Sequence, residues 1–449
     1  MNILLISPNT LREPYPVYPL GLDHVAAAID PRHRVEIADC NTLDRDGLAR
    51  LLLEFSPRII GISCRNIDNT DAARPRFFIH ACRDLIRWLR ERSRAVLVIG
   101  GAGFTIMPER IFSELDADFG VIGEGERFGQ LVEALDRGER PERIDGIIGR
   151  GGSARLPAPW PHPLARRLPA GQTGHHRYYV ERGGMLNLQS KRGCAFSCLY
   201  CPYPHIEGHR HRLIDPDQVA RAAVALERAG ARYLFFTDSA FNSDINHSLA
   251  VAESLKAAGL AIPWGGFFAP IRLPGDYFQV MADCGLTHVE FGTESLAPAM
   301  LRAYKKPFHV DDVVRAHDHA RAAGIHTAHY LLLGGPGESA TTVAETLASV
   351  DRLARAVFFF FIGVRVYPHT GLYDQALARG QISPETDLLE PVFYRPRRIS
   401  LAAIRALVEE AARGRPNWVT GSGGQESAGL VRRLHDRGFT GPLWEYLAR

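Results

Sequence analysis

The sequence predicts an α/β protein of two domains, a five-stranded doubly wound parallel sheet followed by a partial six-stranded barrel. Short apolar runs alternate with segments of helical period through most of the 449 residues. One stretch rich in Pro, Gly and Arg, residues 151–184, interrupts this alternation and predicts a linker. The chain length is that of about two or three ordinary domains, which agrees with this division.

The first domain is expected to span residues 1–150. Each of its apolar runs is followed by a loop that contains Gly, Pro, Ser, Asp or Asn. In an open α/β sheet, ligands gather at these carboxyl ends of the strands. We therefore expect a ligand site at that edge. The expected strands are Asn2–Ile6, Arg34–Ala38, Ile59–Ile62, Val96–Ile99 and Phe119–Ile122.

The second domain is expected to span residues 185–385 and to contain six β/α units. Six units are too few to close an eightfold barrel, so we expect a partial barrel that is open on one side. Residues 386–449 contain a helical segment that begins at Ser400, and we expect them to form a helical cap. The expected strands are Leu186–Ser190, Tyr233–Thr237, Trp264–Phe268, His288–Gly292, Thr327–Leu332 and Val357–Val364.

The composition excludes several classes of protein. A hydrophobic content of 46% and a charged content of 23% are typical of a globular chain. The formal net charge of +3 lacks the basic excess of a nucleic-acid binder. No apolar run approaches the roughly 18 residues that a membrane span needs, and the N-terminus resembles a first strand rather than a signal peptide. We therefore expect a cytoplasmic protein with neither a nucleic acid nor a membrane as a partner.

Three cysteines lie within eight residues of one another directly after the first strand of the second domain. Cys194, Cys198 and Cys201 have C-x3-C-x2-C spacing, whereas the other four cysteines are scattered. Three converging thiolates can hold three irons of a [4Fe–4S] cluster and leave the fourth iron open for chemistry. The alternatives are a zinc site completed by His205 or His209, or three unrelated thiols.

This motif and its setting resemble the radical SAM superfamily. The resemblance implies that the three cysteines bind a [4Fe–4S] cluster, that S-adenosylmethionine (SAM) binds the open iron, and that a flavodoxin-type donor supplies electrons. It also implies cofactor contacts at the ends of later strands, although Gly and Pro at such positions also mark ordinary turns. The implied cofactor contacts are Tyr200, Asp238, Ser239, Glu294, Gly334 and Arg365.

The first domain resembles the cobalamin-binding domains of some radical SAM enzymes, through residues 14–22, 100–109 and 123–126. Two observations nevertheless predict that cobalamin is absent. The D-x-H-x-x-G ligand motif is missing, since Asp23 and His24 have the wrong spacing. The loop after the third strand is polar, and we expect its residues Arg65, Asn66 and Asp68 to contact a hydroxylated substrate. Alternatively, Asp68 or Thr70 caps the following helix.

These features together resemble the aminoglycoside C3′-deoxygenating radical SAM dehydratases. That resemblance implies hydrogen abstraction from a polyol or aminosugar such as paromamine, loss of the C3′ hydroxyl, and a separate NADPH reductase that acts on the product. Such a reaction needs an acid and a base, for which the candidates are Asp238, Glu294 and Tyr203. The alternatives are a cobalamin-dependent C-methyltransferase acting on a lipid or natural product, and a non-catalytic cluster-binding protein.

Overall fold

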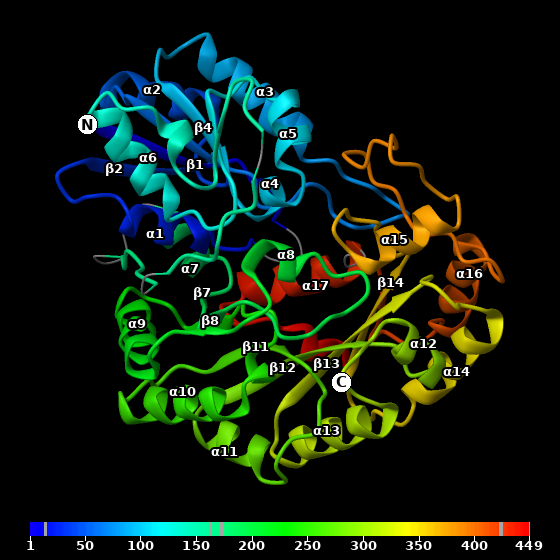
Figure 1. Ribbon diagram of the computed structural model, residues 1–449. Helices are drawn as coiled ribbons and strands as arrows, with labels where there is room; N and C mark the ends of the chain where they lie inside the picture. The colour runs from blue at the N-terminus through cyan, green and yellow to red at the C-terminus, as the bar shows by residue number, and fades with distance from the viewer. Residues whose placement is uncertain (13–15, 154, 162–163, 170–174, 422–424, 449) are drawn as a thin grey trace.

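The computed structural model describes residues 1–12, 16–153, 155–161, 164–169, 175–421 and 425–448, and it shows two α/β units packed together (Figure 1). Three regions named above fall partly outside the described residues. They are the motif at 14–22, which loses residues 14 and 15, the expected linker, and the C-terminal region. No helix among the described residues has the length and apolar character needed to cross a bilayer.

The first sheet has the strand order β2-β1-β3-β4-β5-β6, and its first five strands are parallel, as predicted. Its sixth strand, β6, pairs antiparallel with β5 at the edge. The sequence analysis did not predict β6, which is as short as β5 but is antiparallel and lies at the sheet edge. The strands are β1 (Asn2–Ser7), β2 (Arg34–Asp39), β3 (Ile59–Ser63), β4 (Val96–Gly100), β5 (Phe119–Val121) and β6 (Ile147–Gly149).

Helices cover both faces of this sheet. Alternate residues of β1 point to opposite faces, so Leu4 packs toward α2 and α3 while Leu5 packs toward α1 and α6. Helix α3 begins at Ile79 without a side-chain cap, so neither Asp68 nor Thr70 caps it. The helices are α1 (Leu20–Ala27), α2 (Arg45–Phe55), α3 (Ile79–Arg90), α4 (Ala102–Ile106), α5 (Pro108–Glu114), α6 (Arg127–Asp136) and the short η1 (Pro141–Arg143).

The second sheet contains the six predicted strands in parallel order and a seventh strand, β15, beside β14. In the described residues β7 and β15 are the two unpaired edges, so the barrel is open. The strands are β7 (Met185–Leu188), β10 (Tyr233–Phe236), β11 (Trp264–Phe268), β12 (Leu286–Glu294), β13 (His326–Leu333), β14 (Val357–Ile362) and β15 (Trp418–Thr420), with a separate ribbon of β8 (Lys191–Arg192) and β9 (Arg212–Leu213).

Helices wrap the outer face of the barrel, and α9 and α10 pack against each other (Figure 1). The helices are α7 (His175–Glu181), α8 (Tyr203–Glu207), α9 (Pro216–Arg228), α10 (Ile245–Ala257), α11 (Tyr277–Asp283), α12 (Pro298–Ala303), α13 (Val310–Ala322), α14 (Ala340–Val350), α15 (Gly371–Ala378), α16 (Leu401–Ala411) and α17 (Gln425–Asp436), with short η2 (Phe241–Ser243) and η3 (Trp444–Ala448).

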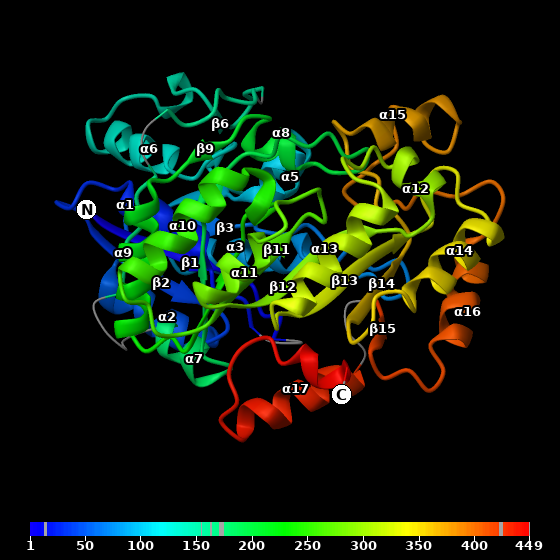
Figure 2. The ribbon, with the colours of Figure 1, turned by 90° about the horizontal axis from the view of Figure 1, so that it is seen from below.

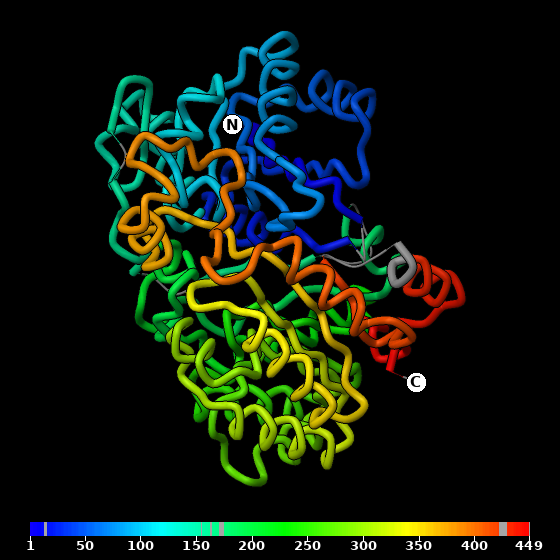
Figure 3. Tube along the Cα trace, turned by 90° about the vertical axis from the view of Figure 1, so that its right-hand side faces the viewer, coloured from blue at the N-terminus to red at the C-terminus, as the bar shows by residue number. Residues whose placement is uncertain are grey.

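The segment around α15 connects the barrel to the first domain. Figure 3 shows this orange segment running beside the blue and cyan N-terminal domain. Leu388 and Leu389 pack into the core of the first domain, and Asp387 forms an ion pair with Arg110 at 2.8 Å. The two domains therefore share a continuous packed boundary.

The C-terminal region is more than the expected helical cap, because it also supplies β15 and η3 (red in Figure 2). Trp444 of η3 is buried against Ala328 and Val357 at one end of the barrel. Its indole Nε1 donates to Glu290 at 2.9 Å, and the Tyr330 hydroxyl donates to the same carboxyl at 2.8 Å. Burial raises the pKa of Glu290 to about 7.

The Glu290 carboxyl makes stability depend on pH. Its folded pKa lies above its ordinary value of 4.5, so protonation stabilises the fold at low pH and this stabilisation is lost as the pH rises from about 4.5 through about 7. We expect the melting temperature of Glu290→Gln to rise relative to wild type between pH 5 and pH 8. Thermal unfolding across this range measures it, with exposed Glu54→Gln as the control. A difference that stays constant with pH would contradict the assignment.

Candidate functional site

A cavity of about 330 Å³ lies where the carboxyl ends of both sheets meet. On one side it is bordered by small residues that follow the strands of the first sheet. On the other side it is bordered by residues next to the cysteine loop. The first set includes Ser7, Ser63, Gly100, Gly101 and Gly123, and the second includes Gln189, Arg192, Tyr203, Glu207 and Thr237.

The inner part of this cavity is an apolar slot between the first sheet and helices α1 and α6. Gly61 of β3 is required there, because a Cβ would come within 2.9 Å of both the Leu5 and the Phe128 side chains. This part of the cavity therefore has apolar walls that suit an apolar group of a ligand. Its walls are Leu5, Gly61, Val98 and Val121 from the sheet, Leu22 and Val25 from α1, and Phe128 from α6.

The structure separates the three residues predicted to contact a hydroxylated substrate. Arg65 lines the cavity, whereas Asn66 is exposed and does not border it. Asp68 is fully buried and accepts a hydrogen bond from Nε of Arg365 at 2.9 Å. Most of the polar character of this loop is therefore directed away from the cavity.

Arg365 was expected to contact a cofactor, but its guanidinium forms hydrogen bonds with other residues of the protein. Besides its bond to Asp68, it donates to the carbonyl oxygens of Val366 at 2.7 Å and Leu388 at 2.6 Å. The side chain is 4% exposed. Arg365 thus fastens the β3–α3 segment of the first domain to the segment that follows β14.

The three cysteines lie in the loop between β8 and α8 as free thiols. Burial raises the pKa of Cys198 and raises that of Cys201 to about 12, so thiolates there need the positive charge of a bound metal. His205 stacks on His369 with ring centroids 4.0 Å apart. Among the described residues no cysteine joins a compact group of three metal-ligating side chains. A single tetrahedral zinc ion needs its ligand atoms close together, so the more widely spaced thiols fit the larger iron–sulfur cluster better.

Tyr200 and Glu294, both predicted cofactor contacts, are brought together beside the cysteine loop. The Tyr200 hydroxyl donates to Glu294 Oε1 at 2.6 Å, and Lys306 Nζ lies 3.2 Å from the same oxygen. Glu294 adopts a φ of +62° after a register shift in β12, which turns its backbone out of the strand. Sequence reasoning gave Lys306 no role.

Asp238 holds the start of the cysteine loop. Its carboxylate accepts from the Ser190 backbone N–H at 2.9 Å and hydroxyl at 2.6 Å, and from the Lys191 N–H at 3.1 Å. It is 1% exposed and does not border the cavity.

Ser239 is half-buried and donates to the Gly193 carbonyl at 3.4 Å. Gly334 has a φ of +100°, which favours glycine.

Tyr203, a predicted acid–base residue, lines the cavity together with Glu207. The Glu207 carboxylate accepts from the Gly193 N–H at 3.0 Å, and its charge raises the pKa of Tyr203. Burial raises the pKa of Glu207 itself. Sequence reasoning missed Glu207, because only the fold turns it toward the cavity.

Buried ion pairs join the two domains at the cavity edge. Arg192, two residues before Cys194, lies 3.0 Å from Glu124 and 2.7 Å from Glu126. Arg212 of β9 also pairs with Glu124. Both glutamates belong to the GEGE segment that follows β5, and sequence reasoning gave neither a role.

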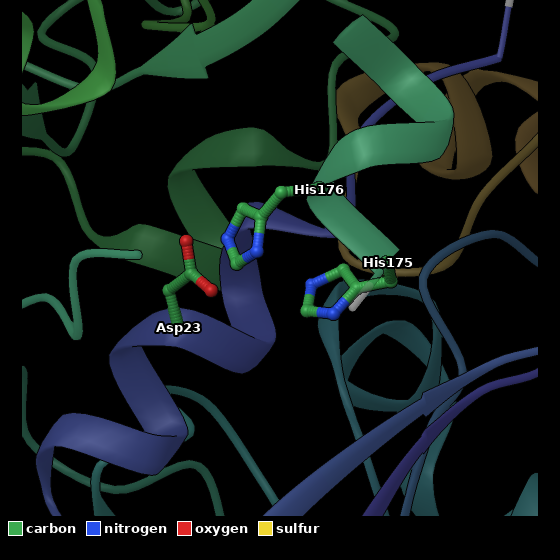
Figure 4. Close-up of side chains that lie close together, drawn as sticks. All are labelled: Asp23, His175 and His176. Atoms are coloured by element: carbon green, nitrogen blue, oxygen red, sulfur yellow. The ribbon is translucent and has the colours of Figure 1, made fainter. Parts of the chain in front are cut away.

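A largely buried histidine-rich cluster lies between α1 and α7. Figure 4 shows Asp23, His175 and His176 pointing toward one another. The Tyr18 hydroxyl donates to Asp23 at 2.8 Å and lies 3.1 Å and 2.6 Å from the histidine Nε2 atoms. Arg166 pairs with the other Asp23 oxygen at 2.9 Å. One hydroxyl can donate one hydrogen bond and accept two, so Tyr18 can donate to Asp23 and accept from both histidines. These hydrogen bonds account for the cluster without a metal. They also hold the Tyr18 ring at the cavity wall.

The sequence matches two known domain families. Residues 188–350 match the radical SAM superfamily, and residues 9–132 match the B12 binding domain. The chain carries a B12-binding domain followed by a radical SAM domain. The site described above lies where these two domains meet.

Several known proteins are similar to this chain over most of its length. A tryptophan 2-C-methyltransferase of Streptomyces laurentii is 25% identical over 445 residues, covering 83% of this chain and 74% of its own. A cytidylyl-2-hydroxyethylphosphonate methyltransferase of Streptomyces wedmorensis is 24% identical over 456 residues, covering 86% and 84%. The methyltransferase TsrM of Kitasatospora setae, solved with cobalamin and a [4Fe–4S] cluster, has the same fold, with a TM-score of 0.86 at 22% identity over 100% of this chain and 97% of that one.

The prediction that cobalamin is absent was wrong. The match of residues 9–132 to the B12 binding domain overturns it. The polarity of the β3–α3 loop misled the prediction, since Asn66 and Asp68 do not face the cavity. The small residues at its rim and the apolar slot behind them fit a corrinoid with a flat aromatic tail.

The Arg192 ion pairs should be important for stability. Removing one partner of a buried ion pair leaves the other charge uncompensated and costs about 3–5 kcal/mol. We expect Arg192→Met to lower the free energy of unfolding by this amount. Arg32→Met removes surface ion pairs and should cost less than about 1 kcal/mol. Thermal or denaturant unfolding compares the two, and equal losses would contradict the importance of the Arg192 network.

Proposed function

We propose that this protein is a cobalamin-dependent radical SAM methyltransferase that methylates a carbon of a small natural product. The observation that supports this most directly is the shared cavity, which is bordered both by the first sheet and by residues next to the cysteine loop. A corrinoid in this cavity would lie beside a cluster bound on the neighbouring cysteine loop. When bound, the cluster supplies electrons to SAM and the corrinoid supplies a cobalt atom that carries a methyl group.

The residues of the chain have distinct tasks in this proposal. Cys194, Cys198 and Cys201 hold three irons, and the Tyr200–Glu294 hydrogen bond fixes the loop that carries them. The radical dehydration of an aminoglycoside expected from the sequence finds no support in the comparisons, which favour the methyltransferase alternative.

The inner face of the barrel favours a substrate with a flat aromatic ring. Along β14, Phe358 and Phe360 are buried, whereas Phe359 and Phe361 are partly exposed on the inner face. Tyr330 stacks on both, with ring centroids 4.9 Å and 6.0 Å away. Such a surface stacks on aromatic rings and offers few partners to the hydroxyls of a sugar.

Phe267 of β11 adds to this inner surface. Its side chain is 38% exposed although its strand lies in the middle of the sheet. A Cβ at Gly292 would meet only the Glu294 carboxylate, at 3.5 Å, so there is open space beside that residue. The relative named for tryptophan, which carries an indole ring, agrees with a substrate of this class.

Labelled SAM tests the reaction. The reconstituted protein is incubated with SAM that carries a CD3 group, a reductant, and either tryptophan and related aromatic compounds or paromamine. We expect the CD3 group to appear in an aromatic product and paromamine to remain unchanged. A dehydrated sugar without CD3 incorporation would contradict the proposal.

Phe267→Ala tests the aromatic surface. Loss of one aromatic contact is worth about 0.5–1.5 kcal/mol, so we expect KM for the aromatic substrate to rise about twofold to tenfold. Exposed Phe439→Ala is the control and should leave KM unchanged. Steady-state kinetics at equal cofactor loading measures both, and an unchanged KM in Phe267→Ala would argue against substrate binding on this surface.

A further inference from the structure

His24 on α1 has a ring nitrogen without a protein partner. The side chain is 5% exposed and lines the cavity. Its Nδ1 lies 2.7 Å from the carbonyl oxygen of Ala165. A carbonyl only accepts, so Nδ1 carries the proton, and Nε2 of the neutral ring is left as an acceptor. Among the described residues, no hydrogen-bond partner reaches Nε2.

Nε2 of His24 is not protonated at physiological pH, so it stays an acceptor without a donor. Burial, together with the positive charges of Arg192 and Arg166, lowers the pKa of His24 to about 3. The ring is therefore neutral at physiological pH. A buried acceptor without a donor costs about 1–3 kcal/mol, and where one occurs in a cavity wall, a ligand can supply the donor.

The position of His24 indicates which part of a ligand it meets. His24 lies on the helix that supplies Leu22 and Val25 to the apolar wall of the cavity. A corrin macrocycle is too broad to pass between a helix and a sheet. The flat benzimidazole of the cobalamin tail is thin enough, and the ribose linked to it carries a hydroxyl that can donate a hydrogen bond.

We propose that Nε2 of His24 accepts a hydrogen bond from the nucleotide tail of the bound corrinoid and so selects corrinoids that carry this tail. The inference rests on the proposed cobalamin dependence. It assigns a cofactor-selecting role to His24 of the Asp23–His24 pair, whose Nδ1 donates to the carbonyl oxygen of the linker residue Ala165.

Two corrinoids and two variants test this role by binding alone. Cobalamin and cobinamide, which lacks the nucleotide tail, are titrated into the full-length apoprotein, and binding is followed by their visible absorption. We expect His24→Phe to weaken cobalamin binding about tenfold, the effect of roughly 1.4 kcal/mol, and to change cobinamide binding less than about twofold. His24→Gln keeps an acceptor and should retain most of the affinity for cobalamin.

The control and the contrary outcomes distinguish this inference from the proposed function. His33 is a buried histidine of the same domain, and both of its ring nitrogens have hydrogen-bond partners. His33→Phe should therefore weaken the binding of both corrinoids equally or leave both unchanged. If His24→Phe lowered the affinity for cobalamin and for cobinamide equally, the role of His24 would be overturned, while the proposed cobalamin dependence would stand. A nitrogen splitting in the Co(II) EPR spectrum that His24→Phe abolishes would also overturn it, since His24 would then ligate cobalt. Failure of the wild type to bind either corrinoid would overturn both proposals.

Discussion

The site depends on the buried contact between Arg192 and the glutamates Glu124 and Glu126. Arg192 directly precedes the cysteine loop, and the glutamates end the loop after β5 of the other domain. A buried charge is costly unless an opposite charge lies beside it. Because Arg192 and the two glutamates come from different domains, they pair only when the domains are packed in this arrangement. A second buried pair, between Arg365 and Asp68, joins the domains at another place. The cavity lies between surfaces that these pairs hold together.

This constraint explains why several polar residues do not face a ligand. Asp68 and Arg365 join the domains, and Asp238 shapes the turn before the cysteine loop. The surface left for a cofactor consists of small residues at the strand ends, an apolar slot, and a few polar groups such as Arg65, Tyr203 and His24. Such a surface suits a large, flat, mostly apolar cofactor whose polar groups lie at its edge.

The strands and the cysteine loop could be predicted from the sequence, because hydrophobic period and ligand spacing are local signals. The strands β6 and β15, each of three residues at a sheet edge, were not predicted. Side-chain direction could not be predicted either. Asp68 and Arg365 are 297 residues apart in the chain, and only the packed fold pairs them. The wrong prediction about cobalamin followed from this, since it counted polar residues in a loop without knowing where they point.

Metal content and absorption of the anaerobically reconstituted full-length protein, prepared with hydroxocobalamin, iron and sulfide, test the central claim most directly. The account predicts about one cobalt and about four irons per chain after desalting, with corrin bands superimposed on the broad cluster absorption. Four irons without cobalt would contradict it, because the cavity between the domains would then hold something other than a corrinoid.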